Sequence, residues 1–373
     1  MKYYRTFLLL SFFILCLFLQ QCRQAKKPDF ATAGEPSYYQ VNDYASIEKY
    51  DTHVHLNVYD STFIELAKAD NFRLLSVNVN PAYYPPIEEQ QNIAVRLVKA
   101  FPRRLAYATT FSLENWGTNG WQQKTLTYLK ESFEKGAIAV KVWKNIGMEL
   151  RDKNDKFVMI DDPGFDPIFD YLEQQHIPVL GHLGEPQDAW LPVEKMNIKS
   201  NQNYFSKHPE FHMFLHPEFP TYQDQIAARD HMLEKHPDLK FIGAHLGSLE
   251  WSTEELGKRL DRFPNMAVDM AARLSHLQYQ AATDWKKVHD FFIKYQDRLI
   301  YATDLEAGGT INKEELKKNI HDKWMHDWNF FVSDSIMHSP AFDAEFKGLK
   351  LPKAIMNKIY QKNAENWFPG INK

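Results

Sequence analysis

Residues 49–56 read KYDTHVHL, a short run that is typical of a β-strand ending in two histidines. Successive side chains of a strand point to opposite faces, so His53 and His55 share one face and can reach the same metal ion. No glycine-rich phosphate loop follows this strand, because Leu56-Asn57-Val58-Tyr59 stands in its place. A dinucleotide-binding fold therefore loses its main support.

Outward from this strand, short apolar or β-branched runs alternate with longer amphipathic segments. Strands are expected at Lys49–Leu56, Phe72–Asn80, Leu105–Leu113, Ala137–Lys144, Pro178–Glu185, Lys240–Ser248, Met266–Arg273 and Leu299–Glu306. Helical spacing of apolar residues marks Ile87–Phe101, Trp121–Lys135, Pro167–Gln175, Gln223–Lys235, Thr253–Arg262 and Trp285–Tyr295. Eight such units predict a closed (β/α)₈ TIM barrel, of the α/β class, rather than an open sheet. The C-terminal part, residues 312–373, is expected to add further helix.

One connection is too long for an ordinary loop between a strand and a helix. The segment Pro186–Tyr222 follows the fifth expected strand and is rich in aromatic residues, histidine and proline. Long loops at the carboxyl ends of barrel strands usually serve as lids or binding insertions. The sequence therefore predicts a single-domain barrel with a long insertion after its fifth strand.

The N-terminus has the composition of an export signal. Lys2 and Arg5 precede an apolar run from Phe7 to Leu19, which is shorter than the roughly 20 residues that span a bilayer. Cys22 follows this run, and Leu19-Gln20-Gln21-Cys22 resembles a bacterial lipobox, although Gln21 is larger than the usual residue there. We expect an exported protein that is anchored to a bacterial envelope membrane by a lipid on Cys22. Plain secretion, including a periplasmic location, is the alternative.

The rest of the sequence indicates the domain boundaries and excludes some kinds of chemistry. We expect a signal peptide with lipobox at 1–22, a flexible polar tether at 23–45 and the barrel at 46–370. The only other cysteine is Cys16, inside the signal, so the barrel has neither disulfides nor a thiol nucleophile. Apolar residues make up 44% of the 373, and the formal net charge is -4. Its basic and acidic residues are interspersed, which gives no reason to expect nucleic acid as a partner.

Residues suited to metal chemistry recur at the ends of the expected strands. His53 and His55 end the first strand, His182 lies near the end of the fifth, His245 near the end of the sixth and Asp304 near the end of the eighth. Active-site residues of barrel enzymes come from these strand ends. A metal held by neutral imidazoles and one carboxylate keeps an open position, where water can ionise near neutral pH.

This ordered set resembles the amidohydrolase superfamily, specifically the amidohydrolase-related group that includes aminocarboxymuconate semialdehyde decarboxylase-like proteins. The resemblance runs from Tyr50 to Phe368 and includes a closing Asn363-Ala364-Glu365-Asn366. It implies that His53, His55, His182 and Asp304 bind a divalent metal. It also implies that His245 lies beside the metal as a catalytic group, or binds a second metal in binuclear members.

Lys141 is open to several interpretations. It ends the fourth expected strand in Ala139-Val140-Lys141-Val142-Trp143, where binuclear relatives place a carboxylated lysine that bridges two metals. Lys141 could instead bind an anionic substrate group or pair with a carboxylate. We expect one metal ion per chain rather than two. Zn²⁺ is the ion expected first, although an imidazole–carboxylate site also accepts Mn²⁺ and other ions.

Substrate recognition is assigned to four residues. Arg273, at the end of the seventh strand, is placed to bind a carboxylate, although a structural ion pair explains it equally well. Trp143 shares a strand face with Lys141 and is expected to line the pocket. His208 and His212, in the insertion, are expected in a lid over the barrel mouth; together with His216 they are spaced by four, but prolines interrupt the helix that would align them.

These observations predict a metal-dependent hydrolase that cleaves a C–N, lactone or ester bond of a small molecule, with Asp304 moving the proton and His245 stabilising charge. The resemblance also allows non-oxidative decarboxylation or hydration of a small carboxylic acid at the same site. A third interpretation, of another class, is a non-catalytic surface lipoprotein that binds a ligand. Related barrels often form dimers, so a homodimer is a further expectation.

Overall fold

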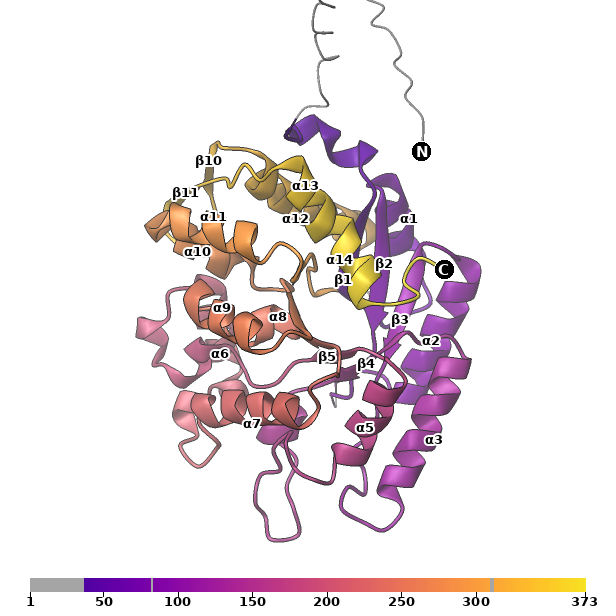
Figure 1. Cartoon of the computed structure of the whole chain (residues 1–373). Helices are drawn as coiled ribbons and strands as arrows, with labels where there is room; N and C mark the ends of the chain where they lie inside the picture. Colours follow the sequence, from indigo (N-terminus) through magenta and orange to yellow (C-terminus); the bar gives the residue numbers. More distant parts are fainter. Residues whose placement is uncertain (1–36, 82, 309–311) are drawn as a thin grey trace, which may run out of the picture. The chain divides into compact units, whose positions relative to one another are not determined.

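The computed structural model describes residues 37–81, 83–308 and 312–373 (Figure 1). Pro36–Lys373 forms one compact unit. The predicted signal peptide, with Cys16 and Cys22, and most of the predicted tether lie outside the described residues. The last part of the predicted tether does pack on the barrel, because Tyr39 and Tyr44 are buried and Tyr44 Oη donates to Asp70 over 3.0 Å. The folded unit therefore begins nearer to Tyr38 than to residue 46.

A single parallel sheet forms the centre of this unit. Its strands are β1 (Lys49–Leu56), β2 (Phe72–Val77), β3 (Leu105–Thr109), β4 (Ala139–Val142), β5 (Val179–Gly181), β6 (Phe241–Gly243), β7 (Met266–Asp269), β8 (Leu299–Ile300) and β9 (Leu305–Ala307). They pair in the order β8-β7-β6-β5-β4-β3-β2-β1-β9. Because β8 and β9 are both parts of the eighth expected strand, the two ends of this order are consecutive in the chain. The predicted eight-fold barrel is confirmed.

Hydrogen bonds between β1 and the segment that joins β8 to β9 close the barrel. The Thr52 N–H donates to the Tyr301 carbonyl over 3.2 Å, and the Asp304 N–H donates to the His53 carbonyl over 2.8 Å. Asp51 reinforces this seam, since it accepts the Thr303 hydroxyl over 2.6 Å and the Trp324 indole N–H over 2.9 Å. The closure thus fixes Asp304 directly beside His53.

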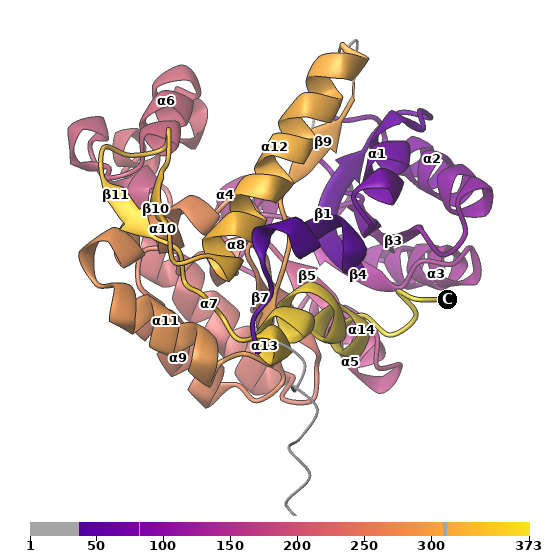
Figure 2. The same cartoon turned by 90° about the horizontal axis from the view of Figure 1, so that it is seen from above.

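Helices surround the barrel, as the view along another axis shows (Figure 2). The main ones are α1 (Thr62–Ala69), α2 (Ile87–Ala100), α3 (Trp121–Glu134), α5 (Asp166–Gln174), α7 (Tyr222–Lys235), α9 (Thr253–Arg262), α10 (Leu274–Thr283), α11 (Trp285–Lys294) and α12 (Lys313–Val332). Their beginnings follow ordinary capping chemistry: Ser252 accepts the Glu255 N–H at the start of α9, and Asn312 accepts the Glu314 N–H at the start of α12. All six helices predicted from periodicity are present to within one residue at each end.

The C-terminal part is less regular than predicted. After α12, a small antiparallel hairpin pairs β10 (Ile336–His338) with β11 (Glu345–Lys347). The chain then forms α13 (Lys353–Asn357), a π-helical turn at Lys358–Lys362 and α14 (Asn363–Trp367). Within α14, the Asn363 side chain donates to the Leu299 carbonyl over 2.7 Å, so this last helix holds the base of β8.

The insertion after β5 is built from short helices: η2 (Gln187–Trp190), η3 (Val193–Lys195), α6 (Lys199–Lys207), η4 (Pro209–Phe211) and η5 (Met213–Leu215). They enclose a small apolar cluster of their own that includes Phe205 and Met213. Asn201 on α6 ties the insertion to the barrel, because its amide donates to Asp188 over 2.8 Å and lies 3.1 Å from His276 Nε2. The predicted long insertion therefore folds as a packed layer.

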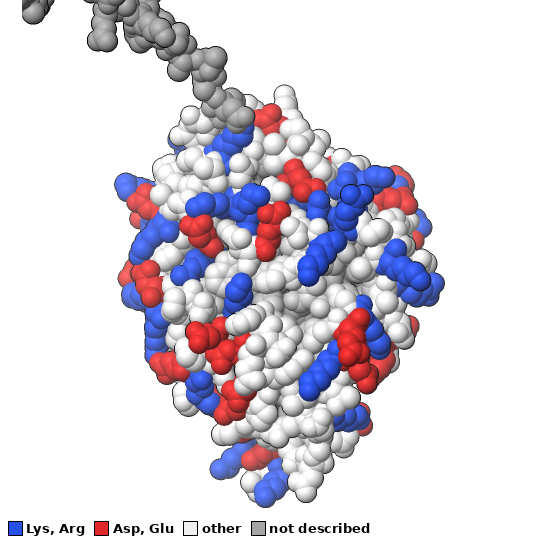
Figure 3. All heavy atoms as spheres, turned by 45° about the vertical axis from the view of Figure 1, so that its right-hand side comes forward, with Lys and Arg blue, Asp and Glu red and all other residues white. Residues whose placement is uncertain are grey.

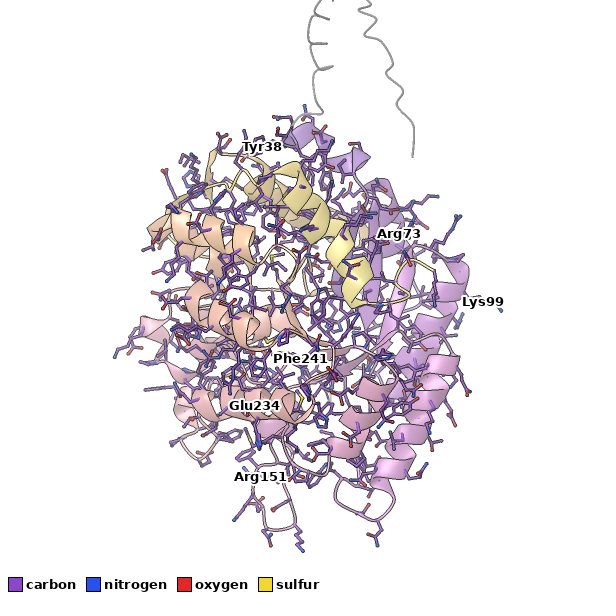
Figure 4. All side chains as sticks on the ribbon, in the orientation of Figure 1. Tyr38, Arg73, Lys99, Arg151, Glu234 and Phe241 are labelled. Carbon is purple, nitrogen blue, oxygen red and sulfur yellow. The ribbon has the colours of Figure 1, made fainter. Side chains whose placement is uncertain are left out.

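Burial and charge follow the architecture. All eight residues of β1 are buried, and Phe241 of β6 lies inside the ring of helices while Lys99 lies at its outer edge (Figure 4). On the face of the surface in Figure 3, basic and acidic side chains are interspersed. Across the described parts of the chain, no helix is both long and apolar enough to cross a membrane.

Candidate metal centre

A cavity of about 400 Å³ opens at the carboxyl ends of the strands. Its floor is formed by His53 and His55 from β1, His182 after β5, His245 after β6 and Asp304 before β9. The structure thus brings together all five residues that the sequence places at strand ends.

The five side chains lie within a few ångströms of one another. One ligand atom each from His53, His245 and Asp304 lies within 4.8 Å of the other two, which is the spacing of a metal-binding group. His55 Nε2 is 3.2 Å from Asp304 Oδ1, and the His182 ring packs against the His245 ring with centroids 4.2 Å apart. The geometric group therefore includes His245 together with two of the four ligands that the family resemblance implies, His53 and Asp304.

Hydrogen bonds on the outer side of three rings fix the orientation of the imidazoles. His55 Nδ1 donates to the Val77 carbonyl over 2.7 Å, and His245 Nδ1 donates to the Ala271 carbonyl over 2.9 Å. His53 Nδ1 donates to Asp269 Oδ2 over 2.8 Å. Because Nδ1 carries the proton in each ring, Nε2 carries the lone pair on the other side.

The charges of the site favour neutral imidazoles around a carboxylate. Burial lowers the pKa of His53 and of His182, and it lowers the pKa of His245 to about 3. Burial alone would raise the pKa of Asp304, but His245, His53 and His55 outweigh it and hold that pKa well below its usual value. Neutral imidazole nitrogens and one carboxylate oxygen are the donors that Zn²⁺ and similar ions take, so this set fits a divalent metal.

Lys141 lies at the centre of this group. It is 1% exposed, and its Nζ lies 3.2 Å from His53 Nε2. Burial lowers the pKa of Lys141 to about 8, while Asp269 and Asp304 act in the opposite direction. Within the described residues it has no carboxylate at ion-pair distance, so the alternative of a structural ion pair is not realised.

The strand ends at the cavity carry strained backbone. Among residues other than glycine, His245, Ala272 and Asp304 have φ of 58°, 55° and 66°, in the left-handed region. Such conformations cost free energy, and they concentrate where surrounding structure holds a side chain in a required direction. Three of them at one mouth indicate that the position of these side chains is built into the fold.

The walls of the cavity combine aromatic and charged side chains. The aromatic ones are Trp143 from the end of β4, Tyr83 and Tyr84 after β2, and Tyr204 and Phe205 from α6. Lys144 and Glu185 form a buried ion pair with each other, and the Tyr84 hydroxyl donates to Glu306 over 2.7 Å. The expected pocket position of Trp143 agrees with this arrangement.

Arg273 lines the same cavity without a carboxylate partner. Its Nε is buried and has no hydrogen bond to a described residue, and a terminal nitrogen donates to the Ala272 carbonyl at 3.3 Å. No acidic side chain of the described residues lies at ion-pair distance from it. A guanidinium in this state can form bidentate hydrogen bonds to an incoming carboxylate.

Two predicted substrate residues lie away from the cavity. His208 is exposed and lies 3.3 Å from Glu210, whereas His212 is buried and its Nε2 donates to the Leu191 carbonyl over 2.8 Å. Neither is among the residues that line the cavity. The contribution of the insertion comes instead from α6, through Tyr204 and Phe205.

Asp269 is the residue that sequence reasoning missed. It is fully buried at the end of β7, and besides His53 it accepts the backbone N–H of His245 over 2.7 Å and of Ala271 over 3.1 Å. Burial opposes its charge, but His53 outweighs this and the pKa of Asp269 is lowered. A carboxylate at the end of an apolar strand was its available signal, the same one that identified Asp304.

Comparisons with known proteins agree with this architecture. The family model described as amidohydrolase matches residues 50–370. A crystal structure of 2,6-dihydroxybenzoate decarboxylase from Rhizobium is 15% identical, with a TM-score of 0.50, and the match covers 86% of this chain and 98% of that chain. A structure of 2,6-dihydroxybenzoate decarboxylase complexed with 2,6-dihydroxybenzoate gives the same identity and coverage, with a TM-score of 0.51. No curated protein sequence matches significantly. Because the family model matches most of the length of this chain, the chain belongs to the amidohydrolase family.

Proposed function

We propose that the chain is a metal-dependent hydrolase that cleaves a C–N, lactone or ester bond of a small molecule. One observation carries this proposal: ligand atoms of His53, His245 and Asp304 lie within 4.8 Å of one another on the floor of a cavity of about 400 Å³. A cavity of this size suits a small organic molecule. Membership of a metal-dependent family supports the same conclusion.

We propose one ion per chain, held by His53, His55, His182 and Asp304, with Zn²⁺ as the first expectation. When bound, a divalent ion supplies a Lewis acid that polarises the scissile carbonyl and activates water. His53 and His55 would offer it their Nε2 lone pairs, because their Nδ1 protons are donated to Asp269 and to the Val77 carbonyl. Lys141 would be carboxylated only in a binuclear form of the site.

In the proposed reaction, Asp304 takes the proton of the attacking water and passes it to the leaving group. Its low pKa keeps it ionised and ready to accept that proton. His245 has its Nδ1 proton bound to the Ala271 carbonyl, so only Nε2 is available on the cavity side. In the proposed mononuclear site this Nε2 lone pair accepts a hydrogen bond from the attacking water and so orients and polarises it.

The substrate is proposed to carry a carboxylate that binds Arg273. The unpartnered Nε of this guanidinium supports the assignment, since a buried donor without a partner is unfavourable until a ligand supplies an acceptor. Trp143 and Tyr204 contribute flat aromatic rings to the lining of the cavity. His208 and His212 have no part in this proposal.

A second candidate is non-oxidative decarboxylation, or hydration, of a small carboxylic acid. The observation that favours it is the pair of cations, Lys141 and Arg273, which face the cavity without ion-pair partners among the described residues. Two unpaired positive charges beside a divalent ion suit a substrate with more than one negative charge. The hydrolase and the decarboxylase share every metal ligand, so the product distinguishes them.

The test measures metal content and reaction products together. By elemental analysis, His182→Ala should hold about one divalent ion per chain fewer than the unchanged protein, whereas Lys141→Ala and His245→Ala should hold as many as the unchanged protein. A panel of amides, lactones, esters and aromatic or unsaturated carboxylic acids is then assayed for hydrolysis and for CO₂ release. Two ions that fall together when Lys141 is replaced would indicate the binuclear form. A protein that holds no metal and gains no activity with Zn²⁺ or Mn²⁺ would instead support the non-catalytic ligand-binding interpretation.

We also propose that the protein is exported and anchored to a membrane through a lipid on Cys22. The support is the charged start, the apolar run Phe7–Leu19 and the cysteine after it, all of which lie outside the described residues. Plain secretion is the alternative. A homodimer remains a proposal from related barrels, to be checked by the molar mass in solution.

A further inference from the structure

A second group of side chains that could bind a metal ion lies on the outside of the barrel, between α5 and α7. Asp170 and Glu173 are three residues apart on one face of α5, and His236 directly follows the last residue of α7. One ligand atom from each lies within 4.8 Å of the other two. Both helices end at the starts of β5 and β6, so this group lies at the opposite end of the strands from the cavity.

His236 is the unusual member of this group. It is 3% exposed, and both ring nitrogens are buried without a hydrogen bond to any described residue. Its ring packs against the ring of Phe169, with centroids 5.5 Å apart, and this contact holds it in place. A buried imidazole with two unsatisfied nitrogens is costly unless a ligand bonds to one of them.

Of the three carboxylates around His236, only that of Asp166 forms an ion pair with a described lysine or arginine. Asp166, at the start of α5, forms an ion pair with Lys235 and lies 3.5 Å from His236 Nε2. Asp170 has no lysine or arginine at ion-pair distance in the described parts of the chain, and neither has Glu173. Glu173 Oε1 accepts only the Asp238 N–H, over 2.8 Å. Two carboxylates that face an imidazole and have no basic partner among the described residues attract a cation.

The distances suit direct ligation by one ion. His236 Nδ1 lies 3.2 Å from Asp170 Oδ1, although their orientation is not that of a hydrogen bond. Two ligands that each lie about 2.0–2.2 Å from one Zn²⁺ are about 3 Å apart in tetrahedral or octahedral coordination. The Asp170 side chain is 55% exposed, so an ion can enter from solvent and complete its coordination with water.

We propose that His236, Asp170 and Glu173 form a second divalent-metal site that is separate from the catalytic cavity. One imidazole and two carboxylates select a borderline transition ion such as Zn²⁺ over Mg²⁺ or Ca²⁺, which prefer oxygen ligands alone. A bound ion links the end of α7 to α5. In the chain, α7 begins at Tyr222, 48 positions after α5 ends at Gln174. Its role is therefore to stabilise this side of the barrel, and it does not depend on the proposed reaction.

Equilibrium dialysis of the purified protein against micromolar ZnCl₂ tests this site. The unchanged protein should hold one more zinc per chain than His236→Asn and than Asp170→Asn. Zinc should also raise the melting temperature of the unchanged protein more than that of either variant, since an ion that binds the folded state stabilises it. Catalytic rate should be the same in all three, because none of these residues contacts the cavity.

His231→Asn is the matched control. His231 is also on α7 and lies 2.8 Å from a single carboxylate, Asp161, but it belongs to no group of three ligands in the described residues. This variant should keep the full zinc content. Equal zinc in the unchanged protein and both test variants, or an equal loss in the control, would overturn the site. If His236→Asn does not fold, Asp170→Asn decides the question, because its exposed side chain can be replaced without disturbing the core.

Discussion

At the scale of single residues, Asp269 connects three parts of the site. One of its oxygens accepts a hydrogen bond from His53 Nδ1–H, and the other accepts hydrogen bonds from the backbone N–H groups of His245 and Ala271. It therefore sets both the tautomer of His53 and the position of the turn that carries His245. Carboxylates behind metal-binding histidines tune affinity in this way.

Asp269→Asn should lower metal affinity and turnover by about 10–100-fold. The new amide N–H₂ faces His53 Nδ1, so the ring moves its proton to Nε2, and the lone pair toward the metal is lost. Competition with a chelator measures the affinity, and turnover is measured at saturating metal. Asp327→Asn is the control, since Asp327 is equally buried and accepts the Tyr301 hydroxyl over 2.9 Å outside the cavity. A loss of stability with unchanged metal affinity in Asp269→Asn would contradict the assignment.

Glu250 makes the stability of the folded protein depend on pH. It is 1% exposed, one oxygen accepts the Gln187 N–H over 2.9 Å, and the other has no hydrogen-bond partner in the part of the chain that the structure describes. Burial raises the pKa of Glu250 to about 7, against the opposing effect of Arg273. Between about pH 4.5 and pH 7 the folded state therefore holds a proton that the unfolded state has released, and the contribution of Glu250 to stability falls as pH rises.

Glu250→Gln should remove this slope, which is at most about 1.4 kcal/mol per pH unit. The glutamine carbonyl can still accept the Gln187 N–H, so the variant should gain stability relative to the unchanged protein as pH rises from 5 to 7.5. Denaturant unfolding at both pH values measures the difference. An equal pH dependence in the two proteins would show that Glu250 is ionised in the fold throughout this range.

At the scale of elements, the sequence predicted where strands begin better than where they end. β1, β3 and β7 begin at the predicted residues, but the sixth predicted strand, Lys240–Ser248, ends after Gly243 in a tight turn, α8 (Ala244–Gly247). Buried residues continue past the last strand hydrogen bond because the side chains at the mouth still face the interior. Hydrophobic periodicity reports burial, so it cannot show where pairing stops.

The candidate ligands were predictable because each lies near the end of an expected strand, and their order along the chain can be read directly from the sequence. Their hydrogen-bond partners were not, since Val77, Ala271 and Asp269 meet the histidines only through the closed barrel. The sequence also did not show which residues of the insertion would line the cavity. His208 and His212 have the side chains that suggest chemistry, yet packing of the short helices places Tyr204 and Phe205 at the cavity.

Gly243→Ala should disturb the turn that carries His245. A Cβ at Gly243 would lie 2.8 Å from the Gly247 Cα, and both are backbone positions that a side-chain rotation cannot relieve. We expect a loss of about 1–3 kcal/mol of stability and a lower turnover number, because His245 moves with the turn. Gly117→Ala is the comparison: it has open space but a φ of +75°, so it should cost roughly 1 kcal/mol and leave turnover unchanged. Full turnover in Gly243→Ala would mean that His245 tolerates displacement.

At the scale of the whole molecule, the barrel is complete without the N-terminal segment. Pro36–Lys373 is one compact unit, and its β8-to-β9 closure and its C-terminal helices all lie within it. The proposed export signal and lipid site precede this unit in the chain. Localisation and catalysis should therefore be separable by a single substitution.

Cys22→Ser should release the protein from the membrane without changing the enzyme. Stable membrane anchoring needs more than one acyl chain, and in the proposed lipoprotein these chains are attached through Cys22. We expect the unchanged protein in the membrane fraction and the variant in the soluble fraction, with equal metal content and equal turnover per molecule. Fractionation of cells that express each form, followed by immunodetection, measures this. Membrane association of both forms would indicate that the apolar run Phe7–Leu19 itself is the anchor, and a soluble unchanged protein would establish plain secretion.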